Sequence, residues 1–318
     1  MPGRYILTDS VPATTDRLLH VVVNACAGTA QAPDLRETLE KAFRQRGAVA
    51  RIVFARGGPE MTDAIAAACA AKPDAIVAGG GDGTISAVAQ AALAAGITLG
   101  VLPLGTLNHF AKDAGIPRAL DEAVETVCAG HTITVDVGEV GGRIFLNNSS
   151  VGLYPRIVRH RDGQMRHTGR AKWLALLVAT LTVLRLTPLA RFRIRIDGAD
   201  EQRRTSLMMI GNNEYGMDGY HFGERKRLDA GHLTLYAPRH CGHGALLWLA
   251  LLALLGRLGQ GKEIESRPAK DIVIDSASDH LQVATDGEVS LMPTPLRYRI
   301  RPRALRVLAP ARPGTGGV

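Results

Sequence analysis

Hydrophobic and polar positions follow two different rhythms along the chain. Up to about Gly130, short apolar runs of strand length alternate with longer segments whose apolar residues recur every three or four positions, which is the spacing of a helix. The predicted strands are 20–24, 49–54, 75–78 and 98–102, and the predicted helices include 33–46, 59–71 and one that begins near residue 84. Alternating strands and helices predict parallel β-α-β units, whose ligands gather at the carboxyl ends of the strands.

Beyond Gly130, strand-like segments follow one another without crossover helices between them. The predicted strands are 132–138, 143–148, 190–197, 206–211, 233–236, 272–275, 281–285 and 296–301. In 191–197 and 296–301 apolar residues alternate with arginines, so one face of each strand is apolar and the other basic. This part is therefore predicted to be mostly antiparallel, as a sandwich or a curled sheet.

The two rhythms predict the fold class: an N-terminal Rossmann-like parallel α/β domain followed by an antiparallel β-sandwich domain with inserted helices. The predicted domains span 1–130 and 131–310, and the final strand, about 304–308, could return to the first domain. The tail at 311–318 is rich in proline and glycine and is predicted to be disordered.

The inserted helices are two leucine-rich segments at 171–186 and 244–258. Both are shorter than the roughly 20 apolar residues that span a bilayer, so they are predicted to be core helices or, alternatively, to wall an apolar pocket or touch a membrane surface. A basic stretch at 155–172 precedes the first of them. Such a stretch is either solvated surface or a docking site for an anionic membrane.

Composition narrows the partners only in part. The chain has 318 residues, 46% of them hydrophobic, and a formal net charge of +8, which favours anionic partners. The four cysteines are scattered without a Cys-x-x-Cys pair, so neither a disulfide framework nor a zinc site is indicated and a reducing cytoplasm is the expected setting. No secretory signal is visible at residues 1–10.

A glycine-rich loop at 79–84 follows one predicted strand and opens a predicted helix. Its sequence is Gly79-Gly80-Gly81-Asp82-Gly83-Thr84. A glycine loop at a helix N-terminus offers N–H groups and a positive dipole end to phosphate, and Asp82 suits a divalent cation between its carboxylate and the phosphates. The loop has neither the Lys-Ser/Thr ending of a P-loop nor the dinucleotide spacing. The alternative is a tight turn in which Asp82 caps the helix.

Two further loops end at the same predicted edge of the sheet. In 103–108, Pro103 fixes φ, Gly105 frees it, Thr106 is a plausible N-cap, and Thr106 and Asn108 can face a nucleotide. The alternative is a plain connection between strand and helix. The loop at 24–28 follows the first strand. Three loops at the carboxyl ends of parallel strands together predict one site.

Gly80-Gly81-Asp82-Gly83-Thr84 resembles the nucleotide-binding signature of the diacylglycerol kinase catalytic-domain family, which includes bacterial lipid kinases and the sphingosine and ceramide kinases. The same short signature occurs in NAD kinases and phosphofructokinases. The segment at 102–111 resembles the family's second block, in which the Gly-Thr pair and the Asn line the nucleotide site. His109 stands where the family often has Asp and is given no role. In the first loop Asn24 and Gly28 match, whereas the family more often has Ser before this glycine.

Later blocks extend the resemblance to residues 19–310. Thr285-Asp286-Gly287-Glu288 resembles the block with the catalytic base, which implies that Asp286 is the base and Glu288 a supporting acid. From the residues alone, Asp-Gly is equally a hairpin turn. The segments at 136–138 and 145–153 resemble the start of the family's second domain. The segment at 211–233 resembles the block that holds a structural magnesium ion, but Ala230 replaces one of its acids and leaves Asp229.

The resemblance implies an ATP-dependent lipid kinase that uses magnesium. The implied nucleotide-binding residues are Asn24, Gly28, Gly79, Gly80, Gly81, Asp82, Gly83, Thr84, Pro103, Gly105, Thr106 and Asn108. The implied catalytic residues are Asp286, Glu288 and Asp82, and the implied metal ligands are Asp82 and Asp229. The first domain would bind nucleotide and the second the lipid substrate.

The expected setting is the cytoplasm, with peripheral contact to the inner, anionic membrane surface. No nucleic-acid partner is expected, because the arginine-faced strands lack the interleaved aromatics of single-strand binders. The chain could form a homodimer. The alternatives are an NAD kinase-like kinase of a soluble substrate and a non-catalytic protein that binds nucleotide or lipid. The leucine-rich segments and the basic stretch favour the lipid kinase over the kinase of a soluble substrate, whereas absence of ATP turnover across a lipid panel would favour the non-catalytic protein.

Overall fold

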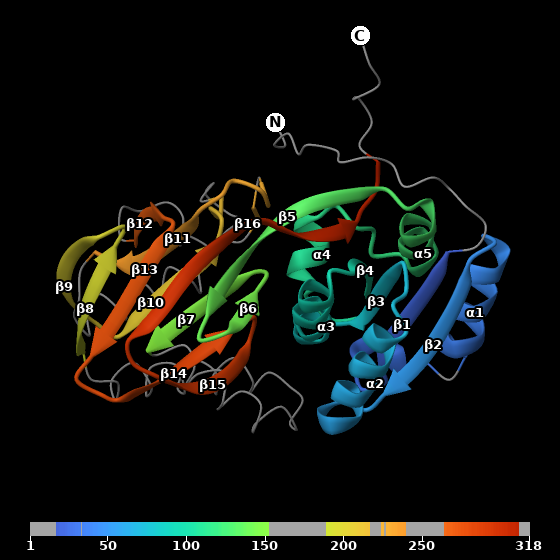
Figure 1. Cartoon of the computed structure of the whole chain (residues 1–318), viewed down its shortest axis with the longest axis horizontal. Helices are drawn as coiled ribbons and strands as arrows, with labels where there is room; N and C mark the ends of the chain where they lie inside the picture. Colours follow the sequence, from blue (N-terminus) through green and yellow to red (C-terminus); the bar gives the residue numbers. More distant parts are fainter. Residues whose placement is uncertain are drawn as a thin grey trace, which may run out of the picture. The chain divides into compact units, whose positions relative to one another are not determined.

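The computed structural model describes residues 17–32, 34–152, 189–216, 224–225, 227–239 and 264–311 (Figure 1). The chain divides into two compact units. The first comprises Met1–Val137, Arg227–Asp229 and Pro302–Val318, and the second comprises Gly138–Lys226 and Ala230–Arg301. The first division thus falls after Val137, and the predicted final strand at 304–308 belongs to the first unit.

The first unit is built on a parallel sheet in the order β2-β1-β3-β4, and the end of β16 runs parallel to β4 through Val307 and Leu99. The strands are β1 (Leu18–Asn24), β2 (Val49–Ala55), β3 (Ala75–Gly80), β4 (Thr98–Pro103) and β16 (Leu296–Leu308). β3 and β4 are buried along their whole length, which is why they read as continuous apolar runs.

Helices connect these strands and cover the sheet. They are α1 (Leu35–Gln45), α2 (Gly58–Ala70), α3 (Asp82–Ala95), α4 (His109–Asp113) and α5 (Leu120–Ala129), with the short η1 (Gly28–Gln31) after β1. α1 contacts α5 and α2 contacts α3, and right-handed crossovers place α1 on the face opposite α2 and α3. α1 buries Leu35, Leu39, Ala42 and Phe43, the apolar positions that predicted it.

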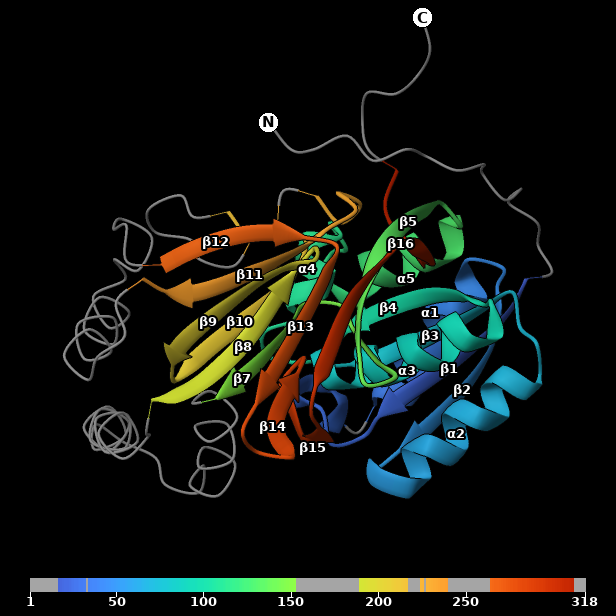
Figure 2. The same ribbon diagram turned by 60° about the vertical axis from the view of Figure 1, so that its left-hand side comes forward.

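The second unit is a sandwich of two antiparallel layers. One sheet has the order β12-β11-β10-β7-β14-β15, and the other layer holds β9, β8, β13 and the first part of β16 side by side (Figure 2). The strands are β5 (Thr132–Val140), β6 (Arg143–Phe145), β7 (Asn148–Gly152), β8 (Ala190–Ile196), β9 (Ala199–Thr205), β10 (Leu207–Asn212), β11 (Leu233–Pro238), β12 (Ile264–Ala269), β13 (Asp271–Ser276), β14 (His280–Thr285) and β15 (Glu288–Pro293).

Apolar side chains from both layers form one core between them. They include Phe192 and Ile194 from β8, Ile272 and Ile274 from β13, and Met208, Ile210, Leu233, Leu235 and Val283 from the opposite sheet. Tyr298 is fully buried among them, packs edge-on against Phe145 and shares a hydrogen bond of 3.1 Å with Ser149. Burial raises the pKa of Tyr298, so its hydroxyl stays neutral in the core.

The predicted fold class is confirmed by this arrangement, with two differences in detail. The strand predicted at 143–148 is wrong, because the chain turns there and forms two strands, β6 and β7. β9, β12 and β15 were not predicted, because polar residues leave no clear alternation of apolar and polar positions along them. The leucine-rich segments, the basic stretch at 155–172 and the tail from 312 lie outside the described residues. Among the helices that the structure describes, none is long and apolar enough to cross a membrane.

Candidate nucleotide site and acidic turn

Three loops of the first unit meet at the carboxyl ends of its parallel strands. β1 leads into α1 and towards β2, whereas β3 lies on the other side of β1, so the strand order reverses between β1 and β3. The first loop, 25–27, follows β1 and leads into η1; only Gly81 separates β3 from α3, so the rest of the predicted glycine loop lies in the end of β3 and the first turn of α3; and the loop after β4 is 104–108. Ligands of open α/β sheets bind at such a reversal point, so the predicted loops stand at the expected place.

Hydrogen bonds tie the three loops into one cradle. The Asn24 amide donates to the Thr84 hydroxyl at 3.1 Å, which joins the first loop to the glycine loop. The backbone N–H groups of Leu104 and Gly105 donate to the Gly80 carbonyl at 3.0 and 3.2 Å, which joins the glycine loop to the third. The cradle is therefore fixed without any ligand.

Glycine at two cradle positions is required by close backbone approach. A Cβ on Gly105 would lie 2.4 Å from the Cα of Gly81, and a Cβ on Gly28 would lie 2.9 Å from the Leu104 carbonyl oxygen. In contrast, a Cβ on Gly81 would make an ordinary contact of 3.5 Å with Gly105. Gly105 and Gly28 thus allow the loops to pack against each other, whereas the backbone at Gly81 remains half-exposed.

Asp82 begins α3 and caps a different helix. Its two carboxylate oxygens accept the backbone N–H groups of His109 and Phe110, each at 3.2 Å, in the first turn of α4. Gly81 is the N-cap of α3 and Asn108 that of α4, so the expectation that Thr106 caps this helix is wrong. Asp82 therefore holds the third loop against the glycine loop while its side chain stays half-exposed.

The predicted nucleotide-binding residues fall into two groups by exposure. The exposed or half-exposed ones, which can reach a ligand, are Asn24, Gly28, Gly81, Asp82, Gly83, Gly105 and Thr106. The buried ones, which support the cradle from behind, are Gly79, Gly80, Thr84, Pro103 and Asn108. Asn108 is 2% exposed, and its amide donates to the carbonyls of Pro103 and Gly105 at 3.2 and 2.7 Å. Its role in the structure is to shape the loop.

Asp286 lies in the second unit, in the two-residue turn between β14 and β15. Asp286 and Gly287 have φ values of 46° and 90°, so the Asp-Gly pair forms the hairpin turn that its sequence allowed. The Asp286 carboxylate accepts the backbone N–H groups of Leu146 and Asn147 at 2.8 Å and that of Asn148 at 3.1 Å. These bonds orient the carboxylate firmly, while Glu288 next to it is exposed.

Arg225, which was not predicted, binds oxygen atoms of the same segment, whereas Asp286 binds its N–H groups. It is 5% exposed, and its guanidinium donates to the carbonyls of Leu146 and Asn212 and, at 2.8 Å, to the side-chain oxygen of Asn147. Segment 146–148 therefore has its backbone N–H groups bound by a carboxylate, while a guanidinium binds the Leu146 carbonyl and the side-chain oxygen of Asn147. Arg225 stands in a polar run whose sequence carries no periodic signal.

Asp229 is less suited to a metal ion than the sequence suggested. Its side chain is 2% exposed, and its carboxylate already binds the Arg227 guanidinium at 3.0 Å. Among the described residues, no group of three His, Cys, Asp or Glu side chains gathers in one place. The cation that Asp229 binds in this structure is an arginine.

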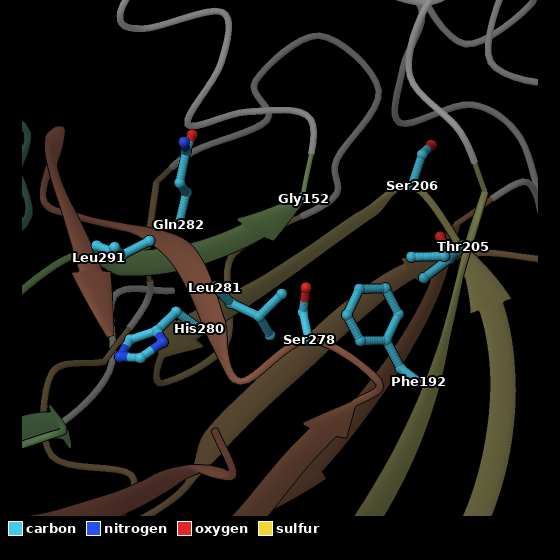
Figure 3. Close-up of a pocket in the computed structure, with 10 residues that line it drawn as sticks. Gly152, Phe192, Thr205, Ser206, Ser278, His280, Leu281, Gln282 and Leu291 are labelled. Carbon is cyan, nitrogen blue, oxygen red and sulfur yellow. The ribbon is translucent and has the colours of Figure 1, made fainter. Parts of the chain in front are cut away.

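The second unit has an open hollow of about 340 Å³ at one end of the sandwich (Figure 3). Its apolar lining includes Phe192 from β8 and Leu281 from β14, which approach the same space from different strands, and Leu291 from β15. Ser206 and Gln282 also line it, and the Ser206 hydroxyl and the Gln282 amide oxygen are buried without a hydrogen-bond partner in the part of the chain that the structure describes. The hollow can hold a mainly apolar group.

A loop cradle at the carboxyl ends of a parallel α/β sheet, in a chain that continues into an antiparallel sandwich, is the arrangement of a nucleotide-binding α/β fold. Two family models match successive parts of the chain: the diacylglycerol kinase catalytic domain matches residues 18–140, and the YegS C-terminal NAD kinase beta sandwich-like domain matches residues 148–309. The chain belongs to the diacylglycerol kinase catalytic-domain family, and the resemblance that the loops indicated is confirmed.

Individual relatives agree with the family. A Pseudomonas aeruginosa protein named "Probable lipid kinase YegS-like" is 33% identical over 248 residues, which cover 74% of this chain and 76% of that protein. A Staphylococcus saprophyticus protein named "Diacylglycerol kinase" is 26% identical over 264 residues, covering 80% and 82%. The crystal structure of a diacylglycerol kinase from Bacillus anthracis matches with a TM-score of 0.66 at 22% identity, over 92% of this chain and 97% of that one, which supports the fold.

Proposed function

We propose that this chain is an ATP-dependent lipid kinase, which phosphorylates a hydroxyl of diacylglycerol or of a related lipid. The observation that carries the proposal is the cradle at the reversal point between β1 and β3, where half-exposed backbone at Gly81 and Gly83 opens α3. Such a site suits the phosphates of a nucleotide. The lipid is suggested by the names of the relatives and by the apolar hollow of the second unit.

In this proposal the cradle binds ATP mainly through its backbone. The N–H groups at the start of α3 and the positive end of its dipole hold the phosphates, with Thr106 exposed on the third loop to contact the nucleotide. The buried residues Asn108 and Thr84 keep the loops in place. Asn24, which binds Thr84, positions the first loop.

Magnesium fits at Asp82 and does not fit at Asp229. Mg²⁺ in kinases is usually held by one or two carboxylates together with substrate phosphates, and Asp82 is a half-exposed carboxylate within the phosphate loop. Asp229 is buried against an arginine. When bound, the ion neutralises charge on the phosphates. Asp82 would hold it while also keeping α4 in place.

The acidic turn supplies the proton acceptor. The lipid hydroxyl oxygen forms a bond to the γ-phosphorus, the bond from that phosphorus to the bridging oxygen breaks, and ADP leaves. The hydroxyl proton passes to the carboxylate of Asp286, which its three N–H donors hold in a single orientation. Glu288, exposed beside it, supports the negative field of the turn. The apolar hollow lined by Phe192 and Leu281 is available to an acyl chain.

We place the enzyme at the inner, cytoplasmic surface of a membrane, because its substrate resides there. The test is to incubate the purified chain with radiolabelled ATP and either mixed micelles of diacylglycerol or NAD. Label in the organic phase supports the lipid kinase, and label in NADP identifies an NAD kinase-like enzyme. Absence of transfer to any lipid across a panel of lipid alcohols overturns the proposal and leaves a non-catalytic binding protein.

A further inference from the structure

The outer face of one sandwich layer carries an unusual amount of positive charge. β9, β8, β13 and the first part of β16 lie side by side in this layer (Figures 1 and 2). Their alternate residues, such as Phe192, Ile194 and Tyr298, point into the core. The residues between them must therefore point outward, because side chains alternate between the faces of a strand.

The outward residues are dominated by arginine. This surface carries seven arginines and three aspartates. The arginines are Arg191, Arg193, Arg195, Arg204, Arg297, Arg299 and Arg301, and the aspartates are Asp200, Asp271 and Asp275. The surplus is four positive charges, which equals half of the formal net charge of +8 of the whole chain. We name these ten residues the arginine face.

Intramolecular pairing accounts for only part of this charge. Arg195 binds Asp200 at 2.8 Å, Arg299 binds Asp271 at 3.4 Å, and Arg301 binds Glu139 at 3.4 Å. Within the described part of the chain the remaining four arginines, Arg191, Arg193, Arg204 and Arg297, form no ion pair. Most of the unpaired charge lies on β8 and β9.

The register of β8 and β9 makes this arrangement costly for the fold. Arg191 stands directly opposite Arg204, and like charges in cross-strand positions destabilise a sheet. An open hollow of about 310 Å³ borders Arg191 and is lined also by Arg193, Gln202, Asp275 and Ser276 among others. An anionic partner bound to this face would offset the repulsion between Arg191 and Arg204. Binding such a partner therefore explains why the fold tolerates two like charges in cross-strand positions.

We propose that the arginine face docks on an anionic lipid bilayer. The outward positions of these strands include no aromatic side chain, which a stacking platform for single-stranded nucleic acid would need. A broad sheet surface with several arginines suits instead the phosphates of a bilayer, where each basic residue strengthens binding about five-fold. The choice of a bilayer rests on the proposed function, because a lipid kinase has to reach a substrate held in a membrane.

The test uses the full chain and vesicles of phosphatidylcholine alone or with a third of phosphatidylglycerol, in co-sedimentation without ATP. The triple variant Arg191→Gln/Arg193→Gln/Arg204→Gln is expected to bind the anionic vesicles about 100-fold more weakly than the unchanged protein. The matched control Lys41→Gln/Arg44→Gln/Lys72→Gln removes the same charge from exposed positions of the first unit and should change binding less than five-fold. Arg→Lys at the same three positions should retain binding.

The outcomes separate this docking surface from its rivals. Equal binding to neutral and anionic vesicles, or equal loss in the test and control variants, overturns the proposal. Binding of the triple variant to anionic vesicles at unchanged strength, together with lost binding to a DNA oligonucleotide in fluorescence anisotropy, assigns the face to nucleic acid instead. Turnover on a short-chain, water-soluble diacylglycerol should be the same in all variants. No turnover in the unchanged protein refutes the kinase, whereas vesicle binding is judged independently of it.

Discussion

Two Asp-Gly turns of the second unit differ in the hydrogen bonds that the aspartate carboxylate accepts. Asp197-Gly198 joins β8 to β9 and Asp286-Gly287 joins β14 to β15, each as a two-residue turn with nearly identical φ values. Asp197 accepts two backbone N–H groups on a single oxygen, at 2.9 Å each, whereas Asp286 accepts three and uses both oxygens. The shared part is what a hairpin needs, so the second engaged oxygen and the neighbouring Glu288 are the features that function has to explain.

The largest difference between the two turns is expected when the aspartate of each turn is replaced by asparagine. Asp286→Asn should lower turnover by about 10²–10⁴-fold, the usual result of losing a general base. It should also lower the free energy of unfolding by roughly 1–3 kcal/mol, because the new NH₂ group would face the N–H of Leu146. Asp197→Asn keeps its single accepting oxygen and should leave both quantities almost unchanged.

Lipid-kinase assays and urea unfolding of both variants check this prediction. Residual turnover of Asp286→Asn above a tenth of the original value would remove Asp286 from the chemistry and leave it as the anchor of segment 146–148. A comparable loss of turnover in Asp197→Asn would show that any disturbed hairpin inactivates the protein. Either result would contradict the inference that the Asp286 turn, unlike the Asp197 turn, has a catalytic role.

A smaller effect is expected at the residue that follows the second turn. Glu288→Gln removes an exposed carboxylate that has no counterpart in the first turn, where Ala199 takes the place. Turnover should fall about 10-fold through the weaker negative field, with stability unchanged, because surface substitutions usually stay within about 0.5 kcal/mol. Steady-state kinetics and a thermal melt measure the two quantities. A loss as large as that of Asp286→Asn would instead make Glu288 the proton acceptor.

The smallest difference is expected between the two glycines. Gly198 and Gly287 both have a φ of 90°, and a Cβ at either position would meet no atom within 4 Å. Gly198→Ala and Gly287→Ala should therefore each cost about 1–2 kcal/mol of stability through backbone strain alone, and by equal amounts. Chemical denaturation of the two variants tests the equality. A cost at Gly287 that exceeds the cost at Gly198 by more than 1 kcal/mol would show that the turns differ in backbone strain as well as in side chains.

The sequence revealed those parts of the molecule that depend on local backbone chemistry. The cradle was visible because its glycines cluster after apolar runs, and both the reversal point and the parallel sheet follow from strands that alternate with helices. β9 was missed although Asp197-Gly198 carries the same turn signal as Asp286-Gly287, because residues on both of its faces are polar, as at Glu201 and Gln202. A strand at the edge of a sheet needs little apolar character.

Contacts between distant segments could not be predicted in this way. Arg225 reaches Leu146 and Asn147 across almost eighty residues of sequence, and nothing in its neighbourhood distinguishes it from other arginines. The same holds for the opposition of Arg191 and Arg204, since the arginines were visible in the sequence but their register across two strands was not. Exposure likewise had to come from the structure, which placed Asn108 behind the cradle.

The close backbone approach of Gly105 to Gly81 has a consequence for how such proteins diversify. Where a binding surface consists of backbone peptide groups, substitutions can change its chemistry very little. Almost any new side chain at these positions would block the surface. New chemical preferences in descendants of this chain should therefore accumulate in the side chains of the sandwich, while the loops around Gly81 persist nearly unaltered.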